Sequence, residues 1–155
     1  MRILFILLTF LLWQFPAYAI LGEKYSTQKT WAGTASNSTA SVKRLVAKMS
    51  TAQTYSVESY VIAGITVREY LLPTGVVFAV TWDGISYPDL SQLLGSYADE
   101  YREKSKEQGK KVGAKRSQVK SDNIVVEKWG RGRSLGGRAY LPNLFPEGVE
   151  LDEIQ

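Results

Sequence analysis

Residues 67–94, VREYLLPTGVVFAVTWDGISYPDLSQLL, hold the densest apolar run outside residues 1–19, together with two turn signals and the start of a helix. Within this stretch, GVVFAVTW (75–82) places Phe78, Val80 and Trp82 on one face of a strand, and the other face is also nearly apolar. A strand with two apolar faces is covered on both sides. The stretch therefore predicts an inner strand of a sheet.

The flanking sequence predicts that this sheet is antiparallel. Pro73-Thr74-Gly75 and Ala63-Gly64 are turn sequences that separate runs of strand-forming residues. The predicted strands are Tyr55–Ile62, Ile65–Leu72, Val76–Trp82 and Asn123–Trp129, with a short fifth over Gly137–Leu141. We therefore expect a sheet of four to five strands.

A helix is predicted directly after the inner strand. Asp89 can cap it, and Gln92, three residues later, has the spacing of a capping box. The apolar positions that share one helical face are Leu90, Leu93, Leu94, Tyr97, Ala98 and Tyr101. We expect one amphipathic helix over Asp89–Lys104, packed on the sheet, in a protein of the α+β class. Gly95 lies inside this helix, where it costs about 1 kcal/mol relative to Ala.

These motifs resemble an uncharacterised bacterial family of exported proteins, the domain of unknown function 2844. The resemblance is carried by VREYLLPTGVVFAVTWDG (67–84), PDLSQLLGSY (88–97) and GRAYLP (137–142), and it covers about residues 55–146. The Ser/Thr-rich N-terminal segment and the long basic linker after the helix depart from the family pattern. The family has no assigned activity, so the resemblance implies a fold and an exported location but no function.

The first nineteen residues predict a secretory signal peptide. Arg2 precedes the uncharged apolar run ILFILLTFLLW, and Ala17-Tyr18-Ala19 has the small-x-small pattern of a cleavage site. An uncleaved membrane anchor is the alternative, but the run is shorter than the ~20 residues that span a bilayer. We expect cleavage after Ala19 and a periplasmic or secreted protein.

The composition excludes several chemistries. The 155 residues contain no Cys and no His. Ser-His-Asp and Cys-His catalysis, His-ligated metal, zinc ribbons, haem attachment and redox cysteine pairs are therefore ruled out. An exported domain without disulfides must be stabilised by its core alone, which suits a bacterial periplasm. We expect no metal and no cofactor.

The net charge of +4 is unevenly distributed along the chain. Residues 102–120 carry eight basic and two acidic side chains, whereas residues 147–155 carry four acidic side chains and no basic one. We expect a polar, partly disordered segment at 20–53, a single domain at 54–146 with a mobile basic linker at 108–118, and an acidic tail at 147–155.

The basic linker is a candidate contact with an anionic envelope surface. The residues that would make this contact are Lys106, Lys110, Lys111, Lys115 and Arg116. A charge run is more often a solvated loop. Export argues against nucleic acid as the partner.

Glu69, Asp83 and Asp89 are the candidate catalytic residues. Two of these carboxylates could supply the general acid and base of a hydrolase. A structural interpretation accounts for them better, with Glu69 on the sheet surface, Asp83 in a turn and Asp89 as the helix cap.

Arginine and tyrosine residues form the candidate binding surface, because both types are enriched in recognition surfaces. The candidates are Arg68, Tyr87, Arg133, Arg138 and Tyr140. Arg138 and Tyr140 lie two residues apart and share a strand face. The alternative, which the sequence favours, is that the tyrosines pack at the edge of the core and the arginines pair with Glu69 and Glu127.

The function expected from these observations is that of a non-enzymatic binding or envelope accessory module. A hydrolase with a carboxylate pair and a structural, envelope-associated protein are the alternatives. A cleft that joins two carboxylates would favour the hydrolase, and an exposed Arg/Tyr surface would favour binding.

Overall fold

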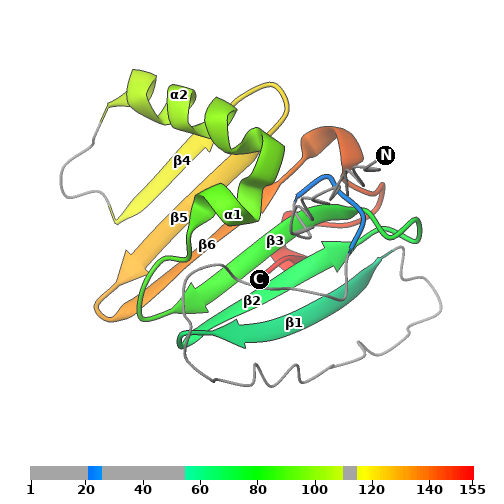
Figure 1. The fold of residues 1–155 in the computed structure, drawn as a ribbon, viewed down its shortest axis with the longest axis horizontal. Coiled ribbons are helices and arrows are strands. Elements are labelled where there is room, and N and C mark those ends of the chain that lie inside the picture. Colours follow the sequence, from blue (N-terminus) through cyan, green and yellow to red (C-terminus); the bar gives the residue numbers. More distant parts are fainter. Residues whose placement is uncertain (1–20, 26–54, 110–114) are drawn as a thin grey trace, which may run out of the picture.

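The computed structural model describes residues 21–25, 55–109 and 115–155, which form one sheet with a helical layer on one face (Figure 1). The predicted signal peptide at 1–19 and residues 20 and 26–53 of the predicted polar segment lie outside these ranges, as do residues 110–114 of the predicted basic linker, which include Lys110 and Lys111. Within them, no helix is long and apolar enough to cross a membrane.

The sheet has six strands in the order β1-β2-β3-β6-β5-β4, and every neighbouring pair is antiparallel. The strands are β1 (Ser56–Ile62), β2 (Ile65–Leu71), β3 (Val77–Gly84), β4 (Arg116–Lys120), β5 (Val125–Arg131) and β6 (Ser134–Tyr140). The predicted α+β class is confirmed. The prediction of four to five strands is wrong, because it missed β4.

β4 lacks the hydrophobic alternation by which a strand is recognised in a sequence. Only Val119 of its five residues is buried, and the other four are exposed. Within the described part of the chain, β4 pairs with β5 alone and forms an edge of the sheet, where charged residues discourage pairing with other chains. Residues 116–118, which were expected in a mobile linker, therefore belong to the sheet.

β3 is an inner strand, as its apolar sequence predicts, and residues 77–82 are all buried. Its register with β2 shifts close to Phe78, as in a β-bulge. Phe78 and Ala79 pack together on one side of the sheet, whereas Val80 and Trp82 pack on the other. The expectation that Phe78 shares a face with Val80 and Trp82 is wrong, because the bulge adds one residue and reverses the alternation.

The two faces of the sheet are covered by different layers. The face here called the helix face bears Val67, Val80, Trp82 and Val126, which belong to one apolar cluster with Leu93 and Leu94. The opposite face, here called the reverse face, bears Tyr70, Ala79, Glu127 and Arg138. Part of the reverse face is covered by residues 142–155, here called the final segment. Figure 1 shows the helical layer in front of the strands.

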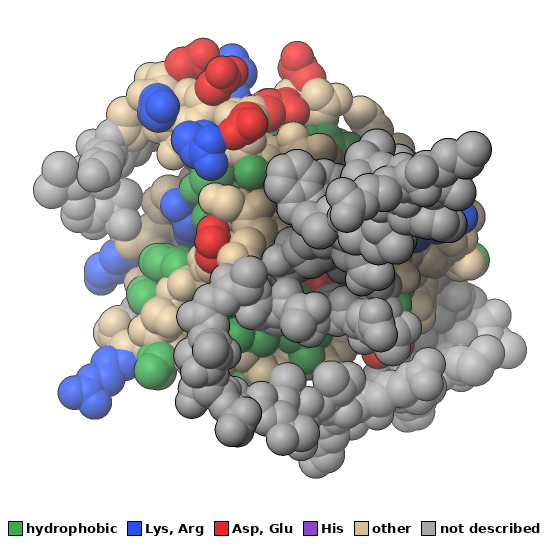
Figure 2. Space-filling model, in the orientation of Figure 1, with side chains coloured by type: hydrophobic (Ala, Val, Ile, Leu, Met, Phe, Trp, Pro, Cys, Tyr) green, Lys and Arg blue, Asp and Glu red, His purple; other side chains and the backbone are tan. Residues whose placement is uncertain are grey.

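The helical layer runs from Leu90 to Gln108 and is interrupted at Gly95. It comprises α1 (Leu90–Leu94), the 3-10 turn η1 (Gly95–Tyr97) and α2 (Ala98–Gln108). Asp89 caps α1, since its side chain accepts a hydrogen bond from Ser91 N at 2.9 Å. Gly95 has φ 52° and ψ −120°, a conformation that is strained for residues with a side chain. Figure 2 shows acidic and basic side chains gathered together over α2.

Gly95→Ala is expected to destabilise the protein by about 1–3 kcal/mol, because Ala must adopt the strained conformation. In an uninterrupted helix, the same change would stabilise by about 1 kcal/mol. Urea denaturation therefore distinguishes the two conformations by the sign of the change in unfolding free energy. Ser96→Ala, at the exposed neighbouring position, is the control. A more stable Gly95→Ala variant would contradict the interruption.

The first described residues are packed against the sheet. Leu21 is buried in the cluster of the helix face. Gly22 N donates to Val77 O at 2.8 Å, and Val77 N donates to Glu23 O at 3.1 Å. Residues 21–25 of the segment expected to be partly disordered are thus held at the start of β3.

The final segment, which contains the predicted acidic tail, is packed on the reverse face. Ile154 is fully buried against Tyr70 and Phe78. The Tyr70 hydroxyl donates to the backbone oxygen of Gln155 at 3.0 Å. The acidic side chains of residues 147–155 are all exposed, so the apolar residues of this segment hold it to the sheet while its charges remain in water.

Candidate functional site

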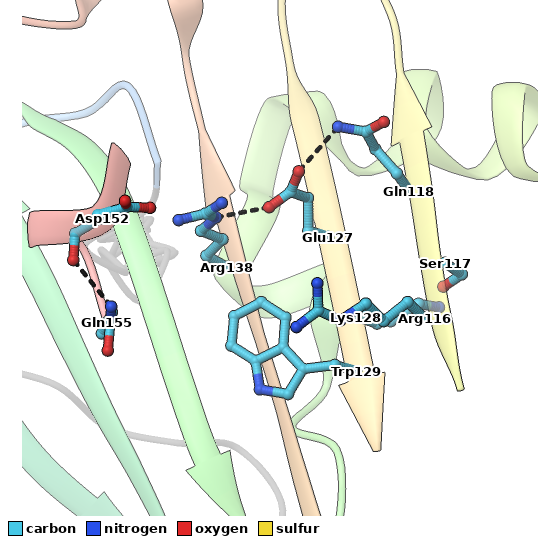
Figure 3. A pocket seen from close by; sticks show the side chains of 9 residues that line it. All are labelled: Arg116, Ser117, Gln118, Glu127, Lys128, Trp129, Arg138, Asp152 and Gln155. Atoms are coloured by element: carbon cyan, nitrogen blue, oxygen red, sulfur yellow. Dashed lines mark hydrogen bonds and ion pairs between the residues drawn. The ribbon is translucent and has the colours of Figure 1, made fainter. Parts of the chain in front are cut away.

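A pocket of about 610 Å³ lies on the reverse face of β4, β5 and β6 (Figure 3). Its lining residues are Arg116, Ser117, Gln118, Glu127, Lys128, Trp129, Arg138, Asp152 and Gln155. The strands supply the floor, and the final segment supplies one wall. Pockets of this size accommodate a small organic ligand.

The register of the three strands brings the floor residues together. Arg116 is the cross-strand partner of Trp129, and Gln118 is the partner of Glu127. Glu127 is in turn the partner of Arg138. Partners in an antiparallel pair project to the same face, so these five side chains lie side by side on the reverse face.

Trp129 lies over β6 because its partner, Gly136, has no side chain. A Cβ atom on Gly136 would come within 2.6 Å of the indole Nε1. Figure 3 shows the indole nearly face-on in front of β6, and the guanidinium of Arg116 reaches toward it from β4. One face of the ring is therefore turned to β6, and the other is turned to the pocket.

Gly137 likewise leaves room for a tryptophan side chain, on the helix face. Its partner in β3 is Trp82, whose indole occupies the place of a Cβ atom on Gly137. Trp82 is 1% exposed and belongs to the core, whereas Trp129 is only partly buried. The absence of side chains at Gly136 and Gly137 thus leaves room for Trp129 at the pocket and for Trp82 in the core.

The centre of the floor is a chain of hydrogen bonds across three strands. Gln118 Nε2 donates to Glu127 Oε1 at 2.7 Å, and Arg138 Nε donates to Glu127 Oε2 at 2.5 Å. Both carboxylate oxygens of Glu127 are therefore engaged. Arg138 Nη1 also donates to Leu151 O at 2.6 Å, which joins the floor to the wall formed by the final segment.

The pocket side of the sheet carries balanced charge. Five of the lining residues are charged, but Lys128 projects to the helix face, where its Nζ donates to the Tyr101 hydroxyl at 2.7 Å. Two positive residues, Arg116 and Arg138, and two negative residues, Glu127 and Asp152, then remain. Arg116 forms no salt bridge with an acid of the described ranges.

The candidate catalytic carboxylates do not meet. Glu69 lies on the helix face, whereas Asp83 is exposed on the reverse face and accepts a hydrogen bond from Ser134 Oγ at 3.3 Å. Asp89 caps α1. The sheet therefore separates Glu69 from Asp83, and none of the three lines the pocket.

Glu69 is buried, which corrects its assignment to the sheet surface. It is 2% exposed, and its Oε1 accepts a hydrogen bond from the Tyr60 hydroxyl at 2.6 Å. Burial, and then the charge of Glu69, raise the pKa of Tyr60 well above its ordinary value. Tyr60 thus stays a neutral donor to Glu69, in keeping with a structural role for the pair.

The structure brings three of the five candidate binding residues to the reverse face. Arg68, Arg138 and Tyr140 all contact the final segment: Arg68 Nη1 donates to Gln155 O at 3.4 Å, and the ring of Tyr140 lies 5.7 Å from that of Phe145. Burial raises the pKa of Tyr140. Of these three residues, only Arg138 lines the pocket, where it pairs with Glu127.

Tyr87 and Arg133 lie apart from this group. The Tyr87 hydroxyl donates to Trp129 O at 3.3 Å, and its ring lies 5.9 Å from Lys128 Nζ, on the helix face. Arg133 is exposed in the turn between β5 and β6. The five residues therefore do not form a single surface.

The candidate basic contact residues are divided by the structure. Lys106 is exposed in the last turn of α2, and Lys115 is exposed next to β4. Arg116 is exposed and lines the pocket. On α2, Arg102 pairs with Asp99, and a second pair of opposite charge follows one turn later. The surface of α2 thus carries both charges, and the excess of positive charge lies in the residues that follow α2 in the sequence.

Several pocket residues were not singled out from the sequence as site residues: Gln118, Glu127, Trp129, Asp152 and Gln155. Glu127 and Trp129 alternate in a predicted strand, so their common face could have been recognised. The final segment gave no such signal, since its place on the sheet depends on long-range packing.

Comparison with known proteins identifies the family of the chain. No curated protein and no solved structure matches it. A family model described as protein of unknown function (DUF2844) matches residues 17–154, which include all six strands and the helical layer. The resemblance carried by the strand and helix motifs is thereby confirmed, and the chain belongs to the DUF2844 family of proteins of unknown function.

Proposed function

We propose that the protein is exported, that residues 1–19 are removed, and that the mature chain is a non-enzymatic binding or accessory module of the periplasm or cell envelope. We place its ligand site in the pocket on the reverse face. The observation that carries this proposal is the partly exposed indole of Trp129, set beside polar and charged side chains whose positions are fixed by the sheet. A rigid aromatic residue flanked by hydrogen-bonding groups is typical of a binding site.

The arrangement of the carboxylates favours binding over hydrolysis. A general acid or base must reach the proton that it transfers. Glu127, at the centre of the pocket floor, is instead held between Gln118 and Arg138, and both of its oxygens accept hydrogen bonds. Glu69 and Asp83 lie on opposite faces of the sheet.

The export part of the proposal is tested by the mass of the processed protein. The full chain is produced in a bacterium, and the periplasmic fraction is analysed by intact mass spectrometry. We expect a polypeptide that begins at Ile20, because Ala17-Tyr18-Ala19 has the pattern of a cleavage site. A membrane-bound product that retains Met1 would contradict the proposal.

The binding part is tested by native mass spectrometry of the protein purified gently from its own cell envelope. We expect a bound non-protein mass on the wild-type chain and its loss from Trp129→Ala. Arg133→Ala, which removes an exposed residue outside the pocket, is the control and should retain the mass. Equal retention of the mass by both variants, or its equal loss from both, would contradict the pocket as the ligand site.

We also propose that basic residues at the rim of the pocket and next to it strengthen contact with an anionic envelope surface. The exposed side chains of Lys115 and Arg116 support this, because they continue the run of positive charge after α2. Such a contact is screened by salt over about 8–10 Å. We expect co-sedimentation with phosphatidylglycerol vesicles at low salt and its loss at high salt. Vesicles that fail to bind the protein at low salt would overturn this contact.

A further inference from the structure

We propose that the ligand of the pocket is a saccharide and that one of its sugar rings stacks on Trp129. This inference rests on the proposed function, since it names the chemical class of ligand for the same site.

The indole of Trp129 offers a flat surface of the kind that sugar rings bind. Because Gly136 has no side chain, the indole lies on β6 with its outer face toward the pocket (Figure 3). The face of an aromatic ring carries partial negative charge. The C–H bonds on one face of a pyranose ring carry partial positive charge, so a sugar ring is attracted to the indole face-on.

The balanced charge of the pocket favours a ligand with little net charge. Arg138 is already paired with Glu127, and Arg116 and Asp152 carry opposite charges at the two sides of the pocket. A phosphate-rich ligand would meet two carboxylates here. A polyhydroxylated, uncharged ligand avoids this repulsion and the cost of burying an unpaired charge.

The rim presents donors and acceptors in the mixture that hydroxyl groups require. Each sugar hydroxyl both donates and accepts a hydrogen bond. Arg116 is a donor, Asp152 is an acceptor, and the amides of Gln118 and Gln155 supply both functions. All four residues are exposed, so a saccharide chain longer than the pocket can continue into solvent.

The inference is tested by isothermal titration calorimetry with a panel of uncharged tetrasaccharides. The panel comprises β-1,4-linked tetrasaccharides of glucose, mannose and N-acetylglucosamine, and the α-1,4-linked tetrasaccharide of glucose. We expect at least one to bind the wild-type mature chain with a Kd of about 1 mM or lower. Trp129→Ala should weaken this binding about tenfold or more, and Trp129→Phe should restore part of it.

Two further variants separate binding from folding. Arg116→Ala removes an exposed rim donor without disturbing the core and should weaken binding several-fold, whereas Arg133→Ala should leave it unchanged. Far-UV circular dichroism melts of each variant verify that the fold is intact. Failure of all four tetrasaccharides to bind at about 10 mM, or equal binding by Trp129→Ala and the wild type, overturns the saccharide assignment.

The outcome also separates this inference from the proposed function. If the tetrasaccharides fail but the envelope-purified protein carries a mass that Trp129→Ala loses, the pocket remains the ligand site and its ligand is not a saccharide. If no mass is carried and no tetrasaccharide binds, the pocket is not a ligand site, and the saccharide assignment is wrong with it.

Discussion

Replacing Phe78 with Ala is expected to lower the free energy of unfolding by about 3–5 kcal/mol. Phe78 is fully buried on the reverse face. Its ring centroid lies 5.8 Å from that of Tyr55 and 5.6 Å from that of Phe145, and both contacts are edge-to-face. The variant would lose this packing and leave a cavity between the sheet and the final segment.

Urea denaturation of the wild type and the Phe78→Ala variant measures this loss. A small domain has about 5–15 kcal/mol of stability in total, so the shift of the transition should be large. Ile85→Ala is the control, because Ile85 is 73% exposed and should change the stability little. Transitions that coincide for Phe78→Ala and the wild type would contradict the burial of Phe78 between the sheet and the final segment.

Gly137→Ala is expected to destabilise the protein by about 3 kcal/mol, the upper range for overpacking a core. The new Cβ would lie 2.6 Å from the backbone oxygen of Glu127 and would collide with the indole of Trp82. Neither the backbone oxygen nor the indole can move away, because Glu127 lies in the neighbouring strand and Trp82 is buried. Where a strand has room, the change from Gly to Ala stabilises by about 0.4–1 kcal/mol, so the sign of the effect is informative.

Gly136→Ala is the matched comparison for this prediction. The three heavy atoms nearest to its Cβ all belong to the partly exposed side chain of Trp129, and none of them is a backbone atom. We expect a smaller loss of stability than for Gly137→Ala, measured in the same urea titrations. Equal losses for the two variants would contradict the assignment of Trp82 to the core and of Trp129 to the pocket.

The sequence predicted those elements whose pattern is local. Residues 55–82 contain three apolar runs separated by turn sequences, and they form the β1-β2-β3 meander. Asp89 was predicted to cap the helix, and it does so. In each case, the residues that determine the structure lie within a few positions of one another.

Other features depend on contacts that no local pattern reveals. β4 has one buried side chain, and it forms a strand because its backbone pairs with β5. The bulge at Phe78 changes which face its ring occupies, although the apolar run itself was recognised. At Gly95, the apolar spacing continues across the interruption and so conceals it.

The pocket was the least predictable feature of all. It combines side chains from β4, β5 and β6 with two residues of the final segment. Arg116 and Arg138 were recognised as candidate contact residues, but for separate surfaces. Their meeting on one face follows from the pairing of β5 with both β4 and β6.

The most direct test of the ligand site compares the two tryptophans that flank β6. The indole N–H resonances of Trp129 and Trp82 are followed in ¹H–¹⁵N spectra while ligand released from the envelope-purified protein is added to the mature chain. We predict that the Trp129 resonance and the side-chain amide of Gln118 shift in a saturable manner, while the Trp82 resonance, in the core of the helix face, stays in place. A shift of Trp82 with Trp129 unchanged would place the ligand on the helix face and contradict the pocket on the reverse face as the ligand site.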